Sequence, residues 1–179
     1  MSGAPDWLRE RLFERRIVML TGPLDGARAA DVEAQLIALD AVGTDAITLH
    51  VDSADGHLES AFLIMDGIDA LRSPVRALCR GQVGGPAIGV VAAAAHRAAT
   101  PHARFRLGQP RTTFSGTPDA IAAQSRQQQD LLWRLHARLA RVTGRPAEEI
   151  AEDVRRGHYL DAREALAYGL IDEIAGHTR

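Results

Sequence analysis

Apolar residues along the chain follow two spacings. Short runs rich in Val, Ile and Leu are typical of buried strands, and they predict strands at residues 17–20, 46–51, 74–79 and 103–107. Longer stretches with apolar residues every three or four positions are typical of packed helices, and they predict helices at 31–40, 58–71, 87–95, 118–143 and 146–156, and a last one ending at Tyr168. This alternation predicts an α/β fold of repeated β-α units, with parallel strands joined by helical crossovers.

The predicted helix 118–143 has two different halves. Its second half carries an apolar stripe, whereas residues 124–129 contain almost nothing apolar. We therefore expect the first half to project from the domain, and the polar segment 111–117 before it to be extended. A long solvated half-helix favours a contact between subunits over a free surface.

Residues 80–89 read Arg-Gly-Gln-Val-Gly-Gly-Pro-Ala-Ile-Gly and join a predicted strand to a predicted helix. Small residues permit a sharp turn there, of the kind that presents a serine nucleophile in many hydrolases. This turn contains no nucleophile. The geometry of a catalytic turn is thus expected without its chemistry.

Composition narrows the functional classes. The chain has 179 residues, a formal net charge of -2 and no evident basic stripe, which argues against nucleic-acid binding. The single cysteine, Cys79, cannot form an internal disulfide and is read as a small buried hydrophobe in a reducing compartment. No signal-like N-terminus or membrane span is evident, so a single cytoplasmic domain is expected. No metal spacing and no phosphate-binding loop occur, so no cofactor is expected.

Several motifs occur in a specific order along the chain. They are Glu-Arg-Arg-Ile-Val-Met-Leu-Thr-Gly-Pro at 14–23, Gly-Gln at 81–82, Gln-Pro at 109–110, Thr-Gly-Arg-Pro at 143–146, Ala-Arg-Glu-Ala at 162–165 and Tyr-Gly-Leu-Ile-Asp at 168–172. Over nearly its whole length the chain resembles the proteolytic subunit of the Clp protease, the ClpP family. The resemblance implies a ClpP/crotonase-like fold over residues 1–179, a projecting handle of strand and helix at about 111–143, and heptameric rings stacked in pairs.

The family cleaves peptides with a Ser-His-Asp triad, and the matching positions here are glycines. The family's serine falls on Gly85, its histidine on Gly108 and its aspartate on Gly157. The oxyanion-binding N–H groups fall on Gly56, which follows Asp55, and on Pro86, which has no N–H. The resemblance therefore implies a degenerate site without catalytic residues.

Other residues near this site are weak substitutes. His57, His158 and Asp161 lie close to it by the resemblance, but without a nucleophile beside them a surface or chamber-lining role is favoured over catalysis. Ser53 and Ser115 are the nearest hydroxyl groups, and both fall in segments where turn chemistry explains them better.

The resemblance also indicates interface positions, which are Arg111, Thr112, Thr113, Gln127, Arg155 and Arg156. In the family an acidic residue and an arginine pair across the ring at the last two positions. Two arginines repel each other, so a partner chain is expected to supply the acid. Thr48 and His50 stand where the family has tyrosines that dock the Clp ATPase, so that docking is expected to be weakened, with any ATPase contact made through the partner ring.

The sequence thus predicts a non-catalytic ClpP-like subunit in a mixed ring with other ClpP-type subunits. Two alternatives stay open. One is a crotonase-like acyl-thioester enzyme, which shares the fold but needs the paired N–H donors that Pro86 interrupts. The other is a homo-oligomer that binds peptides without cutting them.

Overall fold

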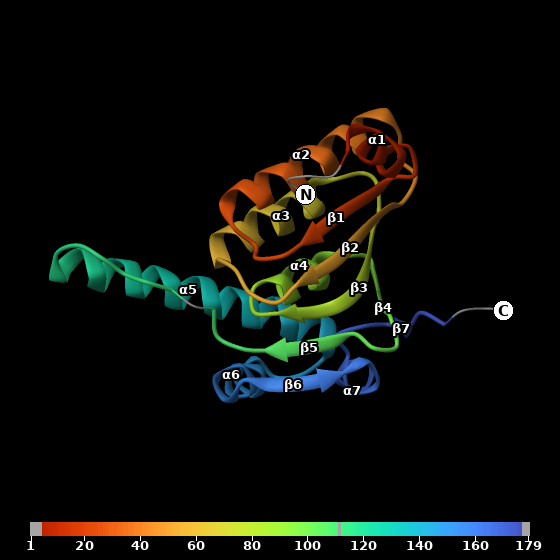
Figure 1. The fold of residues 1–179 in the computed structure, drawn as a ribbon. Coiled ribbons are helices and arrows are strands. Elements are labelled where there is room, and N and C mark those ends of the chain that lie inside the picture. Colours follow the sequence, from red (N-terminus) through yellow and green to blue (C-terminus); the bar gives the residue numbers. More distant parts are fainter. Residues whose placement is uncertain (1–4, 111, 177–179) are drawn as a thin grey trace.

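The computed structural model describes residues 5–110 and 112–176, which form one mixed sheet and the helices packed on it (Figure 1). The strands are β1 Ile17–Thr21, β2 Ile47–Ser53, β3 Val75–Gly84, β4 His96–Ala99, β5 Arg104–Leu107, β6 His158–Asp161 and β7 Glu173–Ile174. Strands β1, β2, β3, β4 and β7 are neighbours in that order, and all of these pairs are parallel. The predicted α/β class with parallel strands is confirmed.

Strand β3 divides the sheet into two branches. Its first part, from Arg76 to Cys79, pairs with β4, whereas its last part, from Gln82 to Gly84, pairs with β5. Strand β6 then pairs with β5 in the antiparallel direction, the one exception to the parallel pattern among the described strands. The end of β3 is thereby placed beside β5 and β6 rather than beside β4.

The helices connect these strands and pack against one another. They are α1 Asp6–Glu14, α2 Gly26–Val42, α3 Leu58–Ala70, α4 Ala87–Ala93, α5 Pro118–Thr143, α6 Ala147–Arg156 and α7 Ala162–Tyr168. Helix α2 packs on α3, α3 on α4, α4 on α5 and α5 on α6. The result is a helix layer that follows the order of the chain.

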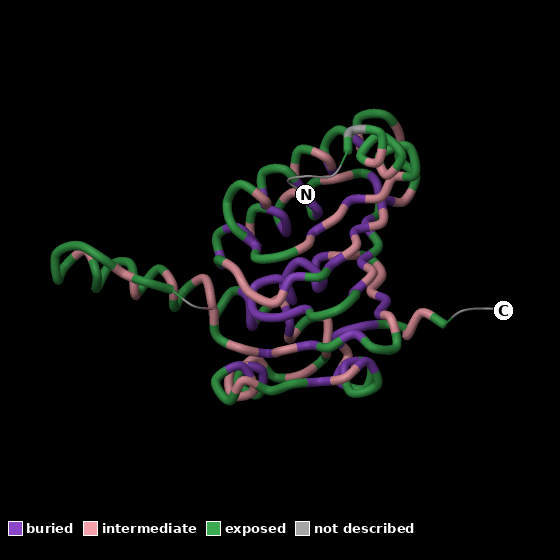
Figure 2. Tube along the Cα trace, viewed as in Figure 1, coloured by how far each residue is buried: buried purple, intermediate pink, exposed green. Residues whose placement is uncertain are grey.

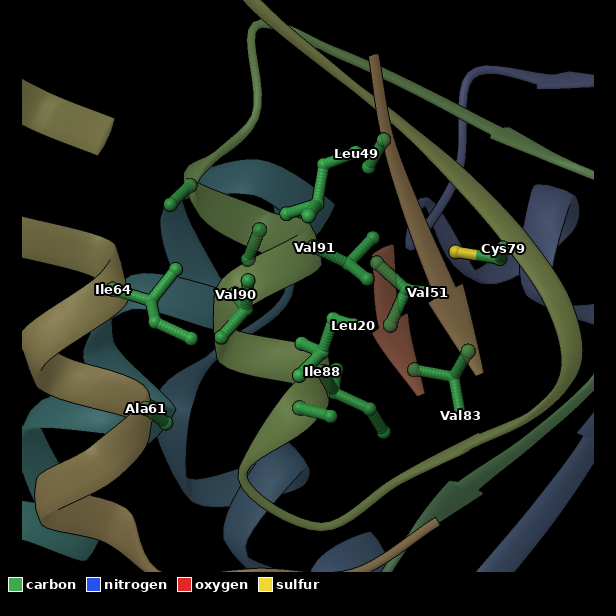
Figure 3. Close-up of a cluster of buried hydrophobic side chains, with 14 of the residues drawn as sticks. Leu20, Leu49, Val51, Ala61, Ile64, Cys79, Val83, Ile88, Val90 and Val91 are labelled. Carbon is green, nitrogen blue, oxygen red and sulfur yellow. The ribbon is translucent and has the colours of Figure 1, made fainter. Parts of the chain in front are cut away.

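Helix α4 is the centre of the apolar core. Every residue of this helix is buried, and Figure 3 shows its side chains among those of three strands and of α3. A Cβ atom at Gly89 would lie 2.5 Å from Leu135 Cδ1 and 2.9 Å from Met65 Sδ, so the glycine lets α3 and α5 approach α4 closely. Cys79 is also buried in this core, and burial raises the pKa of its thiol to about 12.

Helix α5 has the two halves that its sequence predicts. Leu135, His136 and Leu139 are buried, whereas the part before residue 131 is mostly exposed and extends away from the body of the molecule (Figures 1 and 2). Residues 112–117, which precede it, carry no strand in this chain. Within the described residues, the regular part of the projecting segment is therefore helix α5 alone.

Four elements were not predicted from the pattern. Helix α1 is polar, β4 reads His-Arg-Ala-Ala, β6 reads His-Tyr-Leu-Asp and β7 has two residues, so none of them carries a clear apolar period. Strand β4 exists because it lies between the first branch of β3 and β7, which supply its hydrogen bonds. Strand β3 also continues past the predicted end at residue 79, because its last residues find a second partner in β5.

Candidate functional site

The turn between β3 and α4 is tightly built. A Cβ atom at Gly84 would lie 2.7 Å from the carbonyl oxygen of Ala54, so a side chain there would collide with the neighbouring backbone. Gly85 follows with a φ of +52, in the left-handed region that side chains disfavour. Its N–H donates to the carbonyl oxygen of Arg106 at 3.1 Å, which ties the turn to β5. The expected strand-to-helix turn is present, and it offers no hydroxyl or thiol group.

The three glycines singled out by the sequence converge on one region. A Cβ atom built at Gly85 would lie 3.9 Å from the carbonyl oxygen of Gly108, which follows β5. Gly108 and Gly157 both border a cavity of about 290 Å³ between β5, α6 and β6. Gly157 ends helix α6 with a φ of +71, and no atom lies within 4 Å of a Cβ built there.

Arg106 occupies the space next to Gly108. Its Nε, Cζ and Nη2 atoms lie 3.0, 3.4 and 3.5 Å from the position of a Cβ at residue 108. The Nε atom is buried and has no hydrogen-bond partner among the described residues. A larger residue at position 108 would therefore displace a guanidinium group, a relation that the linear sequence does not reveal.

The two expected N–H positions are poorly suited to bind an oxyanion. Pro86, at the start of α4, has no N–H to donate. The N–H of Gly56 donates to the Oδ1 atom of Asp55 at 2.9 Å, so it already binds a carboxylate. A Cβ atom at Gly56 would lie 2.5 Å from the carbonyl oxygen of Leu24, so this position needs a glycine. Neither residue presents a free N–H for a developing negative charge.

Arg155 and Arg156 lie at the end of α6 and border the same cavity. Both bind the Glu152 side chain, Arg155 through Nη2 at 2.7 Å and Arg156 through Nε at 2.8 Å. The hydrogen bond from Arg155, together with both positive charges, lowers the pKa of Glu152 to about 2. Helix α6 therefore supplies an acid within the same chain, three residues before Arg155 and four residues before Arg156. The two arginines do not need a partner chain for this acid.

The candidate substitutes for a catalytic base have other neighbours. Asp161 caps α7, where its Oδ1 atom accepts from the N–H groups of Arg163 and Glu164 at 2.8 and 2.9 Å, and the Glu164 N–H contributes most to lowering the pKa of Asp161. His57 is exposed at the start of α3, and His158 is exposed on β6. Neither histidine forms a hydrogen bond with Asp161 in the described part of the chain, so the three residues do not assemble a catalytic base there.

The two serines also take part in local structure. Ser53 is buried, and its hydroxyl donates to the carbonyl oxygen of Asp55 at 3.4 Å. Ser115 lies in the irregular segment before α5, where its carbonyl oxygen accepts from Gln124 Nε2 at 3.2 Å. The Ser53 hydroxyl is thus bound locally at the end of β2, whereas the bond at Ser115 involves its backbone carbonyl only.

The interface positions on the projecting segment are open to solvent in the single chain. Thr112, Thr113 and Gln127 are exposed, and Arg111 lies outside the described residues. The Nε2 atom of Gln128 donates to Thr112 Oγ1 at 2.8 Å, which holds the segment against α5. These positions do not touch the cavity, so they belong to a different surface.

Thr48 and His50 lie on β2, half-buried. His50 Nδ1 is 3.3 Å from Arg80 Nη1 on β3, and burial, followed by the charge of Arg80, lowers the pKa of this imidazole.

Another cavity, of about 490 Å³, lies between α1, β1 and α2 and includes Leu12, Phe13 and Met19. The polar sequence of α1 gave no indication of it.

Some kinds of site are missing from the described part of the chain. Its His, Cys, Asp and Glu side chains form no group of three that would hold a metal ion. None of its helices combines the length and apolar character needed to cross a bilayer.

Comparison with known proteins places these features in a family. A family model described as Clp protease matches residues 5–178. The chain is 34% identical over 173 residues to ATP-dependent Clp protease proteolytic subunit 1 of Corynebacterium diphtheriae, covering 94% of this chain and 83% of that protein. It is 35% identical over 165 residues to ATP-dependent Clp protease proteolytic subunit 3 of Rhizobium etli, covering 91% of this chain and 85% of that protein. The similarity therefore extends over nearly the whole chain.

Proposed function

Because the chain belongs to the Clp protease family, we propose that it is a non-catalytic subunit of the ClpP type, with a structural or regulatory role in a ring that contains active subunits. The observation that carries this proposal is the meeting of Gly85 and Gly108. Positions 85 and 108 are far apart in sequence, yet a Cβ at the first would lie 3.9 Å from the second. They adjoin where a nucleophile and its base would have to meet, and neither has a side chain.

The N–H groups support the same proposal. Oxyanion donors can retain a measurable rate after the triad side chains are removed, so their state matters separately. Pro86 has no N–H, and the Gly56 N–H is bound to Asp55. The same two features oppose a crotonase-like acyl-thioester reaction, because that chemistry also depends on paired N–H donors.

A second candidate is a homo-oligomer that binds peptides without cutting them. The observation in its favour is Glu152, which binds both Arg155 and Arg156 within one chain. Like charges across a ring contact would then be neutralised in part without a different subunit. A ring of identical chains is therefore compatible with this surface.

The test is native mass spectrometry of the tagged protein isolated from its own cells, beside the same protein purified alone. Complexes that contain active ClpP-type chains, with no stable ring from the purified chain, are the expected result. An assembly of this chain alone would contradict the mixed ring and leave the homo-oligomer.

Catalysis is tested separately with fluorogenic peptides and the purified chain. We expect no hydrolysis above the rate in buffer. Hydrolysis that persists when inhibitors of contaminating serine proteases are present would contradict a non-catalytic subunit, whatever its assembly state.

A further inference from the structure

The cavity between β5, α6 and β6 has an unusual distribution of charge. Three guanidinium groups border it, those of Arg106, Arg155 and Arg156, and no acidic side chain does. Glu152 neutralises one of these charges from outside the cavity. The C-terminus of α6 adds a negative partial charge of about half a unit. The net charge next to the cavity therefore stays positive.

Arg106 differs from the other two arginines. Arg155 and Arg156 have their acid in Glu152, but no ion pair is found for Arg106 among the described residues, and its buried Nε has no hydrogen-bond partner. A buried donor left without an acceptor is costly to the folded chain. A ligand that supplies an oxygen atom to this group would remove that cost.

Position 108 makes room for this arrangement. The Arg106 guanidinium lies 3.0–3.5 Å from the place of a Cβ atom at residue 108, so any residue other than glycine would press on it. Because Gly108 has no Cβ atom, the Arg106 guanidinium can occupy its place next to the cavity.

We propose that this cavity binds the carboxylate of a peptide, with the guanidinium of Arg106 as the main partner. A planar guanidinium matches the two oxygens of a carboxylate, and such pairs are among the stronger hydrogen bonds in proteins. Val154 and Tyr159 add apolar surface to the lining, suited to the last side chain of a peptide. The volume of about 290 Å³ suits a chain end rather than a folded partner.

The choice of a peptide as the ligand rests on the proposed function, since neighbouring active subunits would release peptides with new C-termini. The anion preference itself rests only on the three arginines and the unpartnered Nε. Failure of the purified chain to bind the peptide would therefore leave the proposed mixed ring intact. Absence of a mixed ring would likewise leave the proposed anion site intact.

The experiment is a fluorescence anisotropy titration of the purified full-length protein with fluorescein-labelled Ala-Ala-Leu. The same peptide with a C-terminal carboxamide is the control ligand. We expect the free acid to bind about tenfold or more tightly than the amide, as for a lost charged hydrogen bond. Equal binding of the two peptides, or binding of neither, would overturn the proposal.

Two matched variants locate the site. Arg106→Gln is expected to remove the preference for the acid, whereas Arg104→Gln, the same change two residues earlier on β5, is expected to preserve it. Arg104 is exposed and borders a separate cavity with Asp161 and Glu164. A preference that survives Arg106→Gln, or that is lost with Arg104→Gln, would place the binding elsewhere.

A third variant changes the site in the opposite direction. Glu152→Gln removes the acid that binds Arg155 and Arg156, so the free acid is expected to bind several-fold more tightly. Sodium acetate is expected to displace the labelled acid more effectively than it displaces the amide. Weaker binding by Glu152→Gln, or no displacement by acetate, would contradict recognition of a carboxylate by these arginines.

Discussion

Arg97 and Arg106 lie on the two strands that branch from β3, and they are used in opposite ways. Arg97 on β4 donates from its backbone N–H and its Nε to Asp172 at 2.8 and 3.1 Å, and from Nη1 to the carbonyl oxygen of Gly169 at 3.1 Å. Arg106 on β5 has a buried Nε without a partner beside a cavity. The hydrogen bonds of the first arginine join β4 to the segment before β7, whereas the second has a donor without a partner among the described residues.

This difference separates structural polar groups from functional ones. The pair of Arg138 and Asp69 is satisfied within the chain, with two guanidinium nitrogens each 2.7 Å from a carboxylate oxygen. Arg16 and Arg28 also have a buried Nε without a partner, but their terminal nitrogens donate to backbone carbonyl groups of the fold. Arg106 differs from these arginines because its side chain makes no hydrogen bond among the described residues and borders a cavity. The predictions below test this comparison.

The largest effect is expected from Phe105→Ala, the residue next to Arg106 on β5. Phe105 is 1% exposed, and removing its ring leaves a cavity in the core. The free energy of unfolding should fall by about 3–5 kcal/mol. Urea unfolding followed by circular dichroism measures it. If Phe105→Ala lowered the free energy of unfolding no more than Arg106→Gln, the buried Phe105 side chain would not be what holds β5 in the core.

The matched pair Arg97→Gln and Arg106→Gln tests the comparison directly. Arg97→Gln should lower the free energy of unfolding by about 1–2 kcal/mol, because it removes hydrogen bonds to a carboxylate and a carbonyl. Arg106→Gln should not lower it, because the Arg106 side chain makes no hydrogen bond among the described residues and its buried Nε has no partner to lose. The same urea unfolding experiment compares them.

Two results would contradict this expectation. A large loss of stability in Arg106→Gln would mean that its guanidinium serves the fold. Equal stability of Arg97→Gln and the wild type would mean that the contacts of Arg97 contribute nothing net.

Acid stability is expected to reflect Asp172. The Arg97 guanidinium, and then its backbone N–H, hold the pKa of this carboxyl below its ordinary value of 3.8. Because the unfolded chain takes up the proton first as the pH falls, the stabilisation is complete above about pH 5 and is lost as the pH falls through the lower folded pKa.

Asp172→Asn should therefore flatten the decrease in unfolding free energy between pH 5 and pH 2, by about 1 kcal/mol after allowance for solvent screening. The control is Glu173→Gln, whose carboxylate only approaches His96 Nε2 at 4.0 Å. Parallel pH profiles for the wild type and Asp172→Asn would contradict a structural role for this pair.

Much of the fold could be predicted from the sequence, because buried strands and helices carry their own apolar periods. The runs at Ile17, Ile47 and Val75 begin strands within a residue or two of the expected positions. Strand β4 could not be predicted, because its existence depends on hydrogen bonds from β3 and β7 rather than on its own residues.

The candidate site also has features that the sequence predicts and features that it does not. The absence of a hydroxyl or thiol group from the turn at Gly85 is visible in the sequence, because such a side chain is either present or not. The position of Arg106 beside Gly108, and the shared acid Glu152 of Arg155 and Arg156, depend on side-chain conformations. A helical spacing of three and four residues was the one signal that could have indicated the Glu152 contacts.

The smallest effect is expected at Gly85, Gly108 and Gly157, the positions that the resemblance matches to the family's triad. The variant Gly85→Ser, Gly108→His, Gly157→Asp should hydrolyse fluorogenic peptides no faster than buffer. Pro86 offers no N–H, and the Gly56 N–H remains bound to Asp55. A histidine at 108 would also have to displace Arg106, because its Cβ would lie 3.0 Å from Nε.

The control for this result is the same triple variant with Pro86→Met and Asp55→Gly added. These two changes supply an N–H and release another, so any gain in hydrolysis should begin only in this second protein. Hydrolysis by the triple variant alone would show that the N–H groups were functional and that only side chains had been missing. It would then contradict the proposal that this site does not catalyse peptide hydrolysis.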